Sequence, residues 1–193
     1  MTEIIFQYVN VNYDAHNDAK TLTDPVIINL AAACPKLKKI ELPGTALLTD
    51  ASPTAFFDSC PNLTQLTMTA ASRNNLVLTG SALTSLLENP QYVPKLKKLR
   101  IAHSSIRGFM KAVKDLTRGR ETLTVELVKV TEKKNWGDWD MLVEEQMYKK
   151  GRKVPKRRPR GRGFGLFDDD IEFNNYRMTD EVSAAYLVYD GYY

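Results

Sequence analysis

Hydrophobic residues recur along the first 130 residues in groups of three that share one spacing. In each group the first, fourth and sixth positions are apolar, as in Leu37, Ile40 and Leu42. Short apolar runs of this kind predict strands. The groups follow one another at intervals of 31, 26, 33 and 29 residues, and intervals of that size indicate an internal repeat. The five groups are 6/9/11, 37/40/42, 63/66/68, 96/99/101 and 125/128/130.

Between the predicted strands the apolar residues change to helical spacing. In the first interval Asp24 is a good N-cap, Pro25 suits the first helical position, and apolar residues follow at helical spacing up to Cys34. The next three intervals predict helices that begin at Asp50, Ser81 and Ser105. One strand and one helix cannot bury an apolar face alone, so we expect the pairs to stack side by side in an α/β solenoid.

The two cysteines, Cys34 and Cys60, each precede a proline at the same place in successive intervals. A zinc site needs four donors at short paired spacings, and these thiols with His16 and His103 match no such spacing. A disulfide stays open, because equivalent positions in stacked repeats lie about 4.7–4.9 Å or more apart. Val93 stands at the equivalent place in the third interval, which favours a packed apolar role. The sequence therefore predicts no metal site and no cofactor.

Further markers accompany the cysteines: the letters LTD at 22–24 and at 48–50, and LTG at 78–80. This pattern resembles the cysteine-containing leucine-rich repeats of F-box-type substrate adaptors, over about residues 4–130. The matching residues are Leu22, Thr23, Asp24, Cys34, Pro35, Leu37, Ile40, Leu42, Leu48, Thr49, Asp50, Cys60, Pro61, Leu63, Leu66 and Met68.

The resemblance implies a leucine-rich-repeat solenoid with parallel strands on its concave side and helices on its convex side. It also implies recognition of a substrate protein for ubiquitination. The F-box, which recruits the ligase scaffold, has no counterpart before residue 4. We therefore expect the ligase scaffold as a partner only if an F-box lies upstream.

The side chains between the apolar strand positions predict a binding surface. Strand side chains alternate, so residues next to the core positions face out on the concave sheet, where a solenoid usually binds another protein. An ordinary solvated face is the alternative. The predicted partner-binding residues are Tyr8, Asn10, Lys39, Glu41, Gln65, Thr67, Lys98, Arg100 and Lys129, with Leu127 beside the last.

After the last predicted strand, the stretch around Asp138 predicts a capping helix. Asp138 is a suitable N-cap, and Trp139, Leu142, Val143 and Met147 form an apolar stripe at helical spacing. The open end of a solenoid exposes its core and needs a cap, so we expect the tryptophans of this stretch to cover it. The sequence thus predicts one domain over residues 1–148.

The charge of the chain is placed unevenly. The net charge of +4 arises in residues 149–162, which carry nine cations and no acid, whereas residues 164–193 carry a net charge of −6. We expect residues 149–170 to be a flexible linker, first basic and then acidic. Three readings stay open for the cations: a nuclear localisation signal, weak contact with RNA or DNA, or plain solvation. They are Lys149, Lys150, Arg152, Lys153, Lys156, Arg157, Arg158, Arg160 and Arg162.

The last segment, residues 171–193, contains a candidate short helix. Val182, Tyr186 and Tyr189 fall at helical spacing behind Thr179 and Asp180, either of which suits the cap position. Two readings stay open for this helix. It either folds back on the body of the protein or presents an aromatic motif to a partner.

Several functional classes find no support in the sequence. No stretch approaches the roughly 18 apolar residues of a membrane span, and the N-terminus does not resemble a signal peptide. We therefore expect a nuclear or cytoplasmic protein without a membrane partner. Neither His16 nor His103 stands at motif spacing from a nucleophile, and the acidic run 168–170 lacks the features of a calcium loop. We expect no enzymatic activity.

Overall fold

The computed structural model describes residues 1–6, 18–70, 78–135 and 138–155. These residues form seven strands in one sheet, four α-helices and a short 3-10 helix. The strands are β1 (Glu3–Ile5), β2 (Lys39–Thr45), β3 (Gln65–Ala70), β4 (Lys98–Ala102), β5 (Thr124–Asn135), β6 (Asp138–Lys149) and β7 (Arg152–Val154). The helices are η1 (Asp18–Thr21), α1 (Asp24–Ala33), α2 (Ala51–Ser59), α3 (Ser81–Glu88) and α4 (Phe109–Gly119).

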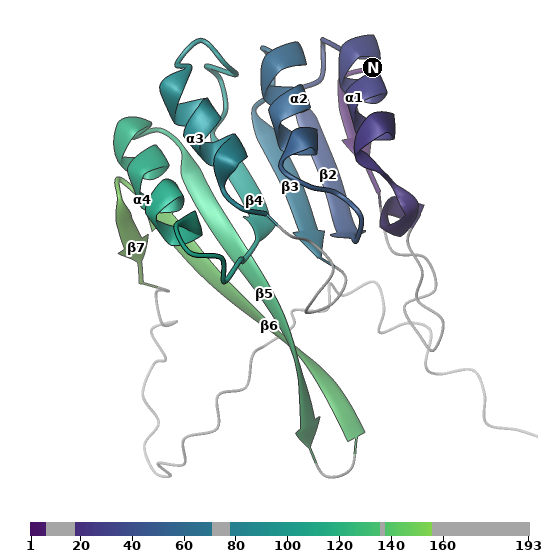
Figure 1. Cartoon of the computed structure of the whole chain (residues 1–193), viewed down its shortest axis with the longest axis vertical. Helices are drawn as coiled ribbons and strands as arrows, with labels where there is room; N and C mark the ends of the chain where they lie inside the picture. Colours follow the sequence, from purple (N-terminus) through teal and green to yellow (C-terminus); the bar gives the residue numbers. More distant parts are fainter. Residues whose placement is uncertain (7–17, 71–77, 136–137, 156–193) are drawn as a thin grey trace, which may run out of the picture. The chain divides into compact units, whose positions relative to one another are not determined.

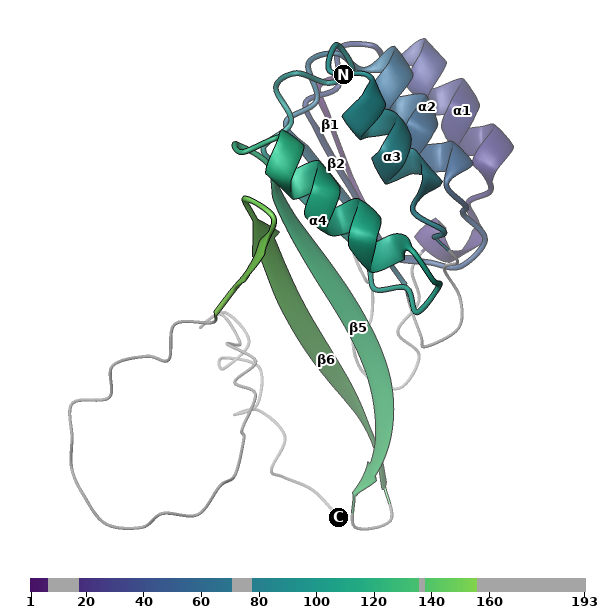
Figure 2. The ribbon, with the colours of Figure 1, turned by 60° about the vertical axis from the view of Figure 1, so that its left-hand side comes forward.

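The strands lie in the sheet in the same order as in the chain. β1 to β5 are parallel, with one α-helix between each strand and the next, and η1 also precedes α1; β5, β6 and β7 are antiparallel neighbours. The four α-helices cover one face of the sheet and leave the other without helices (Figures 1 and 2). The predicted α/β class with mainly parallel strands is therefore confirmed.

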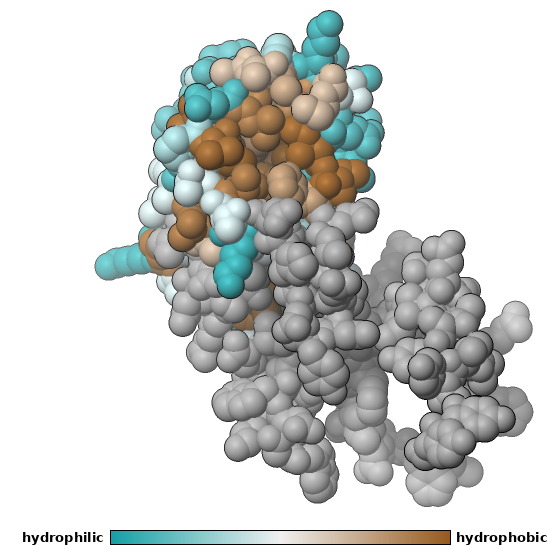
Figure 3. Space-filling view, turned by 90° about the vertical axis from the view of Figure 1, so that its right-hand side faces the viewer, coloured by the Kyte–Doolittle hydropathy of each residue, from teal (hydrophilic) through white to brown (hydrophobic). Residues whose placement is uncertain are grey.

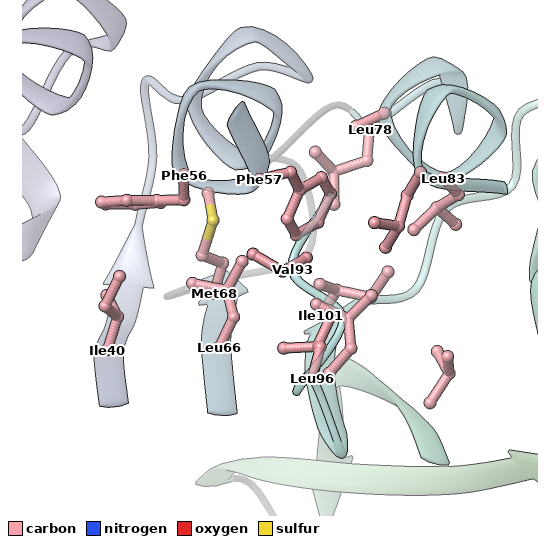
Figure 4. Close-up of a cluster of buried hydrophobic side chains, with 14 of the residues drawn as sticks. Ile40, Phe56, Phe57, Leu66, Met68, Leu78, Leu83, Val93, Leu96 and Ile101 are labelled. Atoms are coloured by element: carbon pink, nitrogen blue, oxygen red, sulfur yellow. The ribbon is translucent and has the colours of Figure 1, made fainter. Parts of the chain in front are cut away.

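The hydrophobic core lies between the helix layer and the sheet. Phe56 and Phe57 of α2 face the sheet, Phe56 on the side of Ile40 (β2) and Phe57 on the side of Leu78, with Met68 of β3 between them, and all these side chains are buried (Figure 4). The predicted strand positions supply the sheet side of this core. Leu37, Ile40, Leu42, Leu63, Leu96, Leu99 and Ile101 are buried in the same cluster.

Two aspartates of the LTD markers join neighbouring strand–helix pairs. The Asp24 carboxylate accepts hydrogen bonds from the Thr49 N–H (3.0 Å), the Thr49 hydroxyl (2.8 Å) and the Ser52 hydroxyl (2.5 Å) at the start of α2. Asp50 in turn accepts from the N–H (2.6 Å) and hydroxyl (2.8 Å) of Thr79 and from the Ala82 N–H (3.3 Å) at the start of α3. Each aspartate thus caps the next helix rather than its own.

This series of aspartates stops at position 80, where the third marker has glycine. Gly80 has a φ of +94°, a conformation that side chains rarely adopt. A Cβ there would also lie 3.4 Å from the Cβ of Ala112 and from Phe109 of α4. Position 80 therefore does not suit an aspartate, and the junction between α3 and α4 is built differently.

Arg120 forms that junction from the opposite ends of the helices. It follows α4, and its guanidinium donates hydrogen bonds to the carbonyl oxygens of Leu86 (2.8 Å) and Asn89 (3.0 Å) at the end of α3 and of Val93 (3.3 Å) in the turn before β4. Burial lowers the pKa of this guanidinium. Close packing supports the junction, since a Cβ on Gly119 would lie 2.5 Å from the Leu87 Cδ1.

Helix α1 begins one residue earlier than predicted, with Thr23 rather than Asp24 as its N-cap, whereas α4 begins later. α1 begins at Asp24, with Pro25 in its first turn. α4 begins at Phe109, four residues after the predicted start at Ser105. The Ser104 hydroxyl accepts the Ile106 N–H in a turn, and Gly108, with a φ of +95°, provides the N-cap. Because this turn occupies the residues after Ser104, α4 begins later in the sequence than predicted.

The first and the last parallel strands differ from the predicted groups. β1 is Glu3–Ile5, with Ile4 beside Ile40, so the group 6/9/11 does not supply the first strand. In β5 the register pairs Leu99 with Val125, so the group 125/128/130 is out of phase with the earlier groups. The reason is a shorter turn after α4. The turn after each helix is closed by a carbonyl, that of Cys60 before β3 and that of Arg120 before β5. β3 begins at Gln65, five residues after Cys60, whereas β5 begins at Thr124, only four residues after Arg120.

The predicted capping helix at 138–147 is wrong, because this stretch is strand β6. It pairs with β5 over eleven residues, from Val125 with Tyr148 to Asn135 with Asp138. A twelve-residue partner strand satisfies the backbone of this stretch, which overrides the weak helical periodicity. The end of the stack is still closed, since Tyr148 is buried in the core. The outer part of the β5–β6 hairpin projects beyond the helix layer (Figures 1 and 2).

The predicted flexible linker at 149–170 is wrong at its beginning. Lys149 pairs with Arg152 in a two-residue turn, in which Lys150 (φ +51°) and Gly151 (φ +74°) are left-handed, as the tight turn of a hairpin requires. The Gly151 N–H donates to the Thr117 hydroxyl of α4 at 3.2 Å. The rest of that segment and the predicted helix of residues 171–193 lie outside the described residues.

Candidate functional site

The face of the sheet without helices carries two rows of side chains, which we call the open face. The register between neighbouring parallel strands aligns these residues across β1 to β5. One row is Glu3, Lys39, Gln65, Lys98 and Thr124, and the other is Ile5, Glu41, Thr67, Arg100 and Glu126. Five strands therefore place ten side chains in a regular array, in which Thr67 is buried and the others are exposed or partly exposed.

Ion pairs and a hydrogen bond connect the two rows near β2. The Lys39 ammonium lies 3.0 Å from the Glu41 carboxylate, and the Gln65 side-chain amide donates to the same carboxylate at 2.9 Å. Glu41 therefore holds a neighbour on its own strand and one on β3. The three side chains therefore form one connected group on β2 and β3.

Two more ion pairs connect β4 with β5 and β6. The Lys98 ammonium lies 3.2 Å from the Glu126 carboxylate, and Arg100 forms an ion pair with Glu145. The Nε of Arg100 is buried and has no hydrogen-bond partner among the described residues. The cations of Lys39, Lys98 and Arg100 are therefore balanced by carboxylates. Partly exposed ion pairs contribute about 0–1 kcal/mol each, so a partner could replace them at small cost.

Exposed apolar side chains lie at both margins of the open face. Ile5 is 41% exposed on β1, the first strand of the sheet. At the other margin Met147 of β6 and Val154 of β7 face each other in register and are 38% and 36% exposed. The open face thus has a polar middle, in which cations are paired with carboxylates, and apolar side chains at both margins.

The structure brings together six of the residues that the sequence predicted for this surface. Lys39, Glu41, Gln65, Thr67, Lys98 and Arg100 lie on the open face. Tyr8 and Asn10 lie outside the described residues. Their predicted place on the first strand is taken by Glu3 and Ile5, which pair with Lys39 and Glu41.

The prediction for Lys129 is wrong, because the last parallel strand has the opposite phase. Leu127, two residues earlier on the same face, is buried in the core at 1% exposure, so Lys129 belongs to the helix side of the sheet. The sequence reasoning missed Glu126 and Glu145, which complete the ion pairs of Lys98 and Arg100. The place of Glu126 depends on the one-residue shorter turn before β5, and that of Glu145 depends on the pairing of β6 with β5.

The cysteines show no sign of reactive chemistry. Both are free, and Cys60 is buried. Burial, with a smaller contribution from Cys34, raises the pKa of the Cys60 thiol to about 11, so it is protonated at neutral pH. Its Sγ lies 3.6 Å from the Cys34 carbonyl oxygen and 3.9 Å from that of Ala31, at the end of α1. Cys60 therefore serves packing at the same turn position that Arg120 occupies later.

The histidines and acids of the described residues form no cluster of metal ligands. No three His, Cys, Asp or Glu side chains there come close enough to hold a metal ion. The His103 ring packs edge-on against Phe109, with 6.5 Å between the ring centres. His16 lies outside the described residues.

Four of the nine predicted basic residues fall within the described ranges. Lys149, Lys150, Arg152 and Lys153 are exposed around the β6–β7 turn, and the Lys150 ammonium lies 3.3 Å from Glu121. The other five, Lys156, Arg157, Arg158, Arg160 and Arg162, lie outside the described residues.

Comparisons with known proteins give no family for this chain. A scan of protein-family models found no match, and a search of curated proteins found no relative. Within the described residues, no helix has the length and apolar character that crossing a membrane requires. Any function must therefore be argued from the arrangement of the residues themselves.

Proposed function

We propose that this chain is a leucine-rich-repeat solenoid that binds a partner protein on its open face. The observation that carries the proposal is the array of ten side chains that five parallel strands hold in register. A stacked strand–helix protein offers such a surface as its usual binding site. The cations of the open face are paired with carboxylates, so this face suits a highly charged ligand less well than a protein.

The specific role that we propose is substrate recognition for a ubiquitin ligase. Its support is the resemblance of the LTD and Cys-Pro markers to the repeats of F-box-type adaptors. The structure gives these markers a physical role, because Asp24 and Asp50 join successive strand–helix pairs and Cys60 packs against the end of α1. These are properties of the stack, whereas the ligase role rests on the resemblance alone.

The test is a quantitative affinity purification with matched variants. A Gln65→Ala, Arg100→Ala double variant removes open-face side chains, and Lys111→Ala on the exposed side of α4 is the control. We expect specific partners to be lost with the double variant and kept with the control. Partners kept by both variants would contradict binding on the open face. Ligase scaffold subunits among the partners would support the ligase role, and their consistent absence would contradict it.

A second candidate function is contact with nucleic acid through the basic turn. The observation that favours it is the exposure of Lys149, Lys150, Arg152 and Lys153 around one hairpin. Replacing these four residues by glutamine keeps the strands and removes the charges. Loss of retention on RNA at low salt would support this function, and unchanged retention would contradict it.

A further inference from the structure

The first strand–helix pair, formed by β1 and α1, has apolar side chains that are exposed or only partly buried. Val26 of α1 is 50% exposed, Ile5 is exposed, and Ile4, Phe6 and Leu30 are only partly buried. Figure 3 shows an apolar patch on this end of the molecule, where β1 and α1 lie. We call the surface formed by these five residues the β1 end.

Equivalent residues in the second pair are fully covered. Ile4 lies beside Ile40, and Phe6 donates its N–H to the Glu41 carbonyl, which places it beside Leu42. Ile40 and Leu42 have no exposed surface. When α1 and α2 are aligned on Asp24 and Asp50, Val26 corresponds to Ser52 and Leu30 corresponds to Phe56. Ser52 and Phe56 are also at 0% exposure. These side chains differ in exposure because a neighbouring pair covers only the second set.

The edge of β1 is also free among the described strands. β2 bonds the backbone groups of alternate residues, since Lys39 donates to the Thr2 carbonyl and Phe6 donates to Glu41. In a parallel ladder this leaves the N–H and C=O groups of Glu3 and Ile5 pointing away from β2. An apolar surface and a row of unpaired backbone groups therefore meet at the β1 end.

We propose that the β1 end binds a second copy of this chain about a twofold axis at Ile4. Antiparallel pairing of the two β1 strands places Glu3 opposite Ile5 of the other copy, so no glutamate faces a glutamate. The outward N–H and C=O groups of these two residues then form hydrogen-bonded pairs. The axis is perpendicular to the sheet, so both helix layers lie on one side and Val26 and Leu30 of the two copies meet. The apolar core continues through the interface, as it does between neighbouring pairs within one chain.

The alternative edge, β7, suits this role less well. Its residues Arg152, Lys153 and Val154 are all exposed, and charged residues on an edge strand disfavour pairing. Pairing of β1 with β7 of another copy would be head-to-tail and would build open chains. The twofold arrangement instead closes after two copies.

Sedimentation equilibrium of the full chain tests the proposal. We expect a dimer that Val26→Glu converts to a monomer, because the charge lies in the new apolar contact. Ile28→Glu is the control on the same helix, since Ile28 is similarly exposed but lines a groove beside Tyr92, away from the β1 end. A wild-type monomer up to the millimolar range would overturn the proposal. Open chains of increasing length, or a dimer that Val26→Glu leaves intact, would also overturn it.

A cross-linking experiment locates the contact without relying on a destabilising charge. In the twofold pair, Glu3→Cys of one copy lies opposite Ile5→Cys of the other at about 5.5 Å between Cα atoms, a distance that a disulfide bridges. We expect the double variant to form covalent dimers with oxidised glutathione, and each single variant to form few. Absence of cross-linked dimers, or equal cross-linking of a single variant, would overturn the twofold arrangement.

Discussion

Neighbouring helices of this protein are joined in two different ways. Between α1, α2 and α3, the aspartates Asp24 and Asp50 accept hydrogen bonds from the N–H groups just before the following helix and from Ser52 or Ala82 in its first turn. Between α3 and α4, Arg120 donates hydrogen bonds to carbonyl groups at the end of the preceding helix. Both devices satisfy backbone groups that a helix leaves unpaired, at opposite ends and with opposite charge. Neighbouring helices can therefore be stacked through either of two kinds of hydrogen-bonded junction.

The largest effect is expected at Arg120. Arg120→Val removes hydrogen bonds to Leu86, Asn89 and Val93 and leaves their carbonyls unpaired, which should cost about 2–3 kcal/mol of unfolding free energy. Urea unfolding followed by circular dichroism measures this loss. Arg120→Lys should recover part of it, because one ammonium cannot reach all three oxygens. An unchanged midpoint for Arg120→Val would show that the arginine does not hold the junction.

A smaller effect is expected at the aspartate junction. Asp50→Ala should cost about 1–2 kcal/mol, since Thr79 and Ala82 lose their acceptor at the start of α3. Asp50→Asn keeps one acceptor oxygen and should cost less. Equal stability of the alanine variant and the wild type would mean that water replaces the carboxylate without loss.

The pH dependence of stability should identify the Asp24 junction. Burial alone would raise the pKa of the Asp24 carboxyl, but hydrogen bonds from Ser52 and Thr49 outweigh it, so the pKa lies below its ordinary value. The stabilisation is therefore complete above about pH 4, where the unfolded carboxyl is ionised, and is lost as pH falls through the lower folded-state pKa. The stability difference between the wild type and Asp24→Asn should shrink over this acid range. A difference that stays constant down to acid unfolding would contradict this assignment.

The smallest effect is expected at Cys60, which occupies the same turn position as Arg120. Cys60→Val should change the unfolding free energy by less than about 1 kcal/mol, because the side chain is buried among apolar groups and valine already stands at position 93. Comparing Cys60→Val with Arg120→Val therefore distinguishes a side chain that stabilises the turn by packing from one that stabilises it by hydrogen bonds. A loss at Cys60 as large as that at Arg120 would remove the distinction between the two junctions.

The sequence pattern predicts the middle of the fold better than its two ends. Residues 37 to 101 combine apolar spacing, helix caps and two marker motifs, so independent signals agree on β2, β3 and β4. At the ends only the apolar spacing remains, and it selected residues 6–11 and the wrong phase in β5. The helical periodicity around Leu142 could not reveal that β5 extends to Asn135 and pairs with this stretch.

The open face shows the same limit. Lys39, Gln65, Lys98 and their neighbours follow from alternation within well-marked strands. Glu145 does not, because its contact with Arg100 depends on a hairpin that brings β6 beside β5. The roles of Asp24 and Asp50 were only half predictable. Their place before a helix is visible in sequence, but which helix they cap depends on how the pairs stack.

The direction of the aspartate contacts has a consequence for synthesis on the ribosome. Asp24 leaves the ribosome before Thr49, and Asp50 before Thr79, so a helix that is just emerging meets an acceptor that is already in place. Arg120 reverses this order, since the carbonyls of Leu86 and Asn89 are made about thirty residues before the guanidinium that binds them. The early helices can therefore dock one after another during translation, whereas the end of α3 is completed only when α4 has been made.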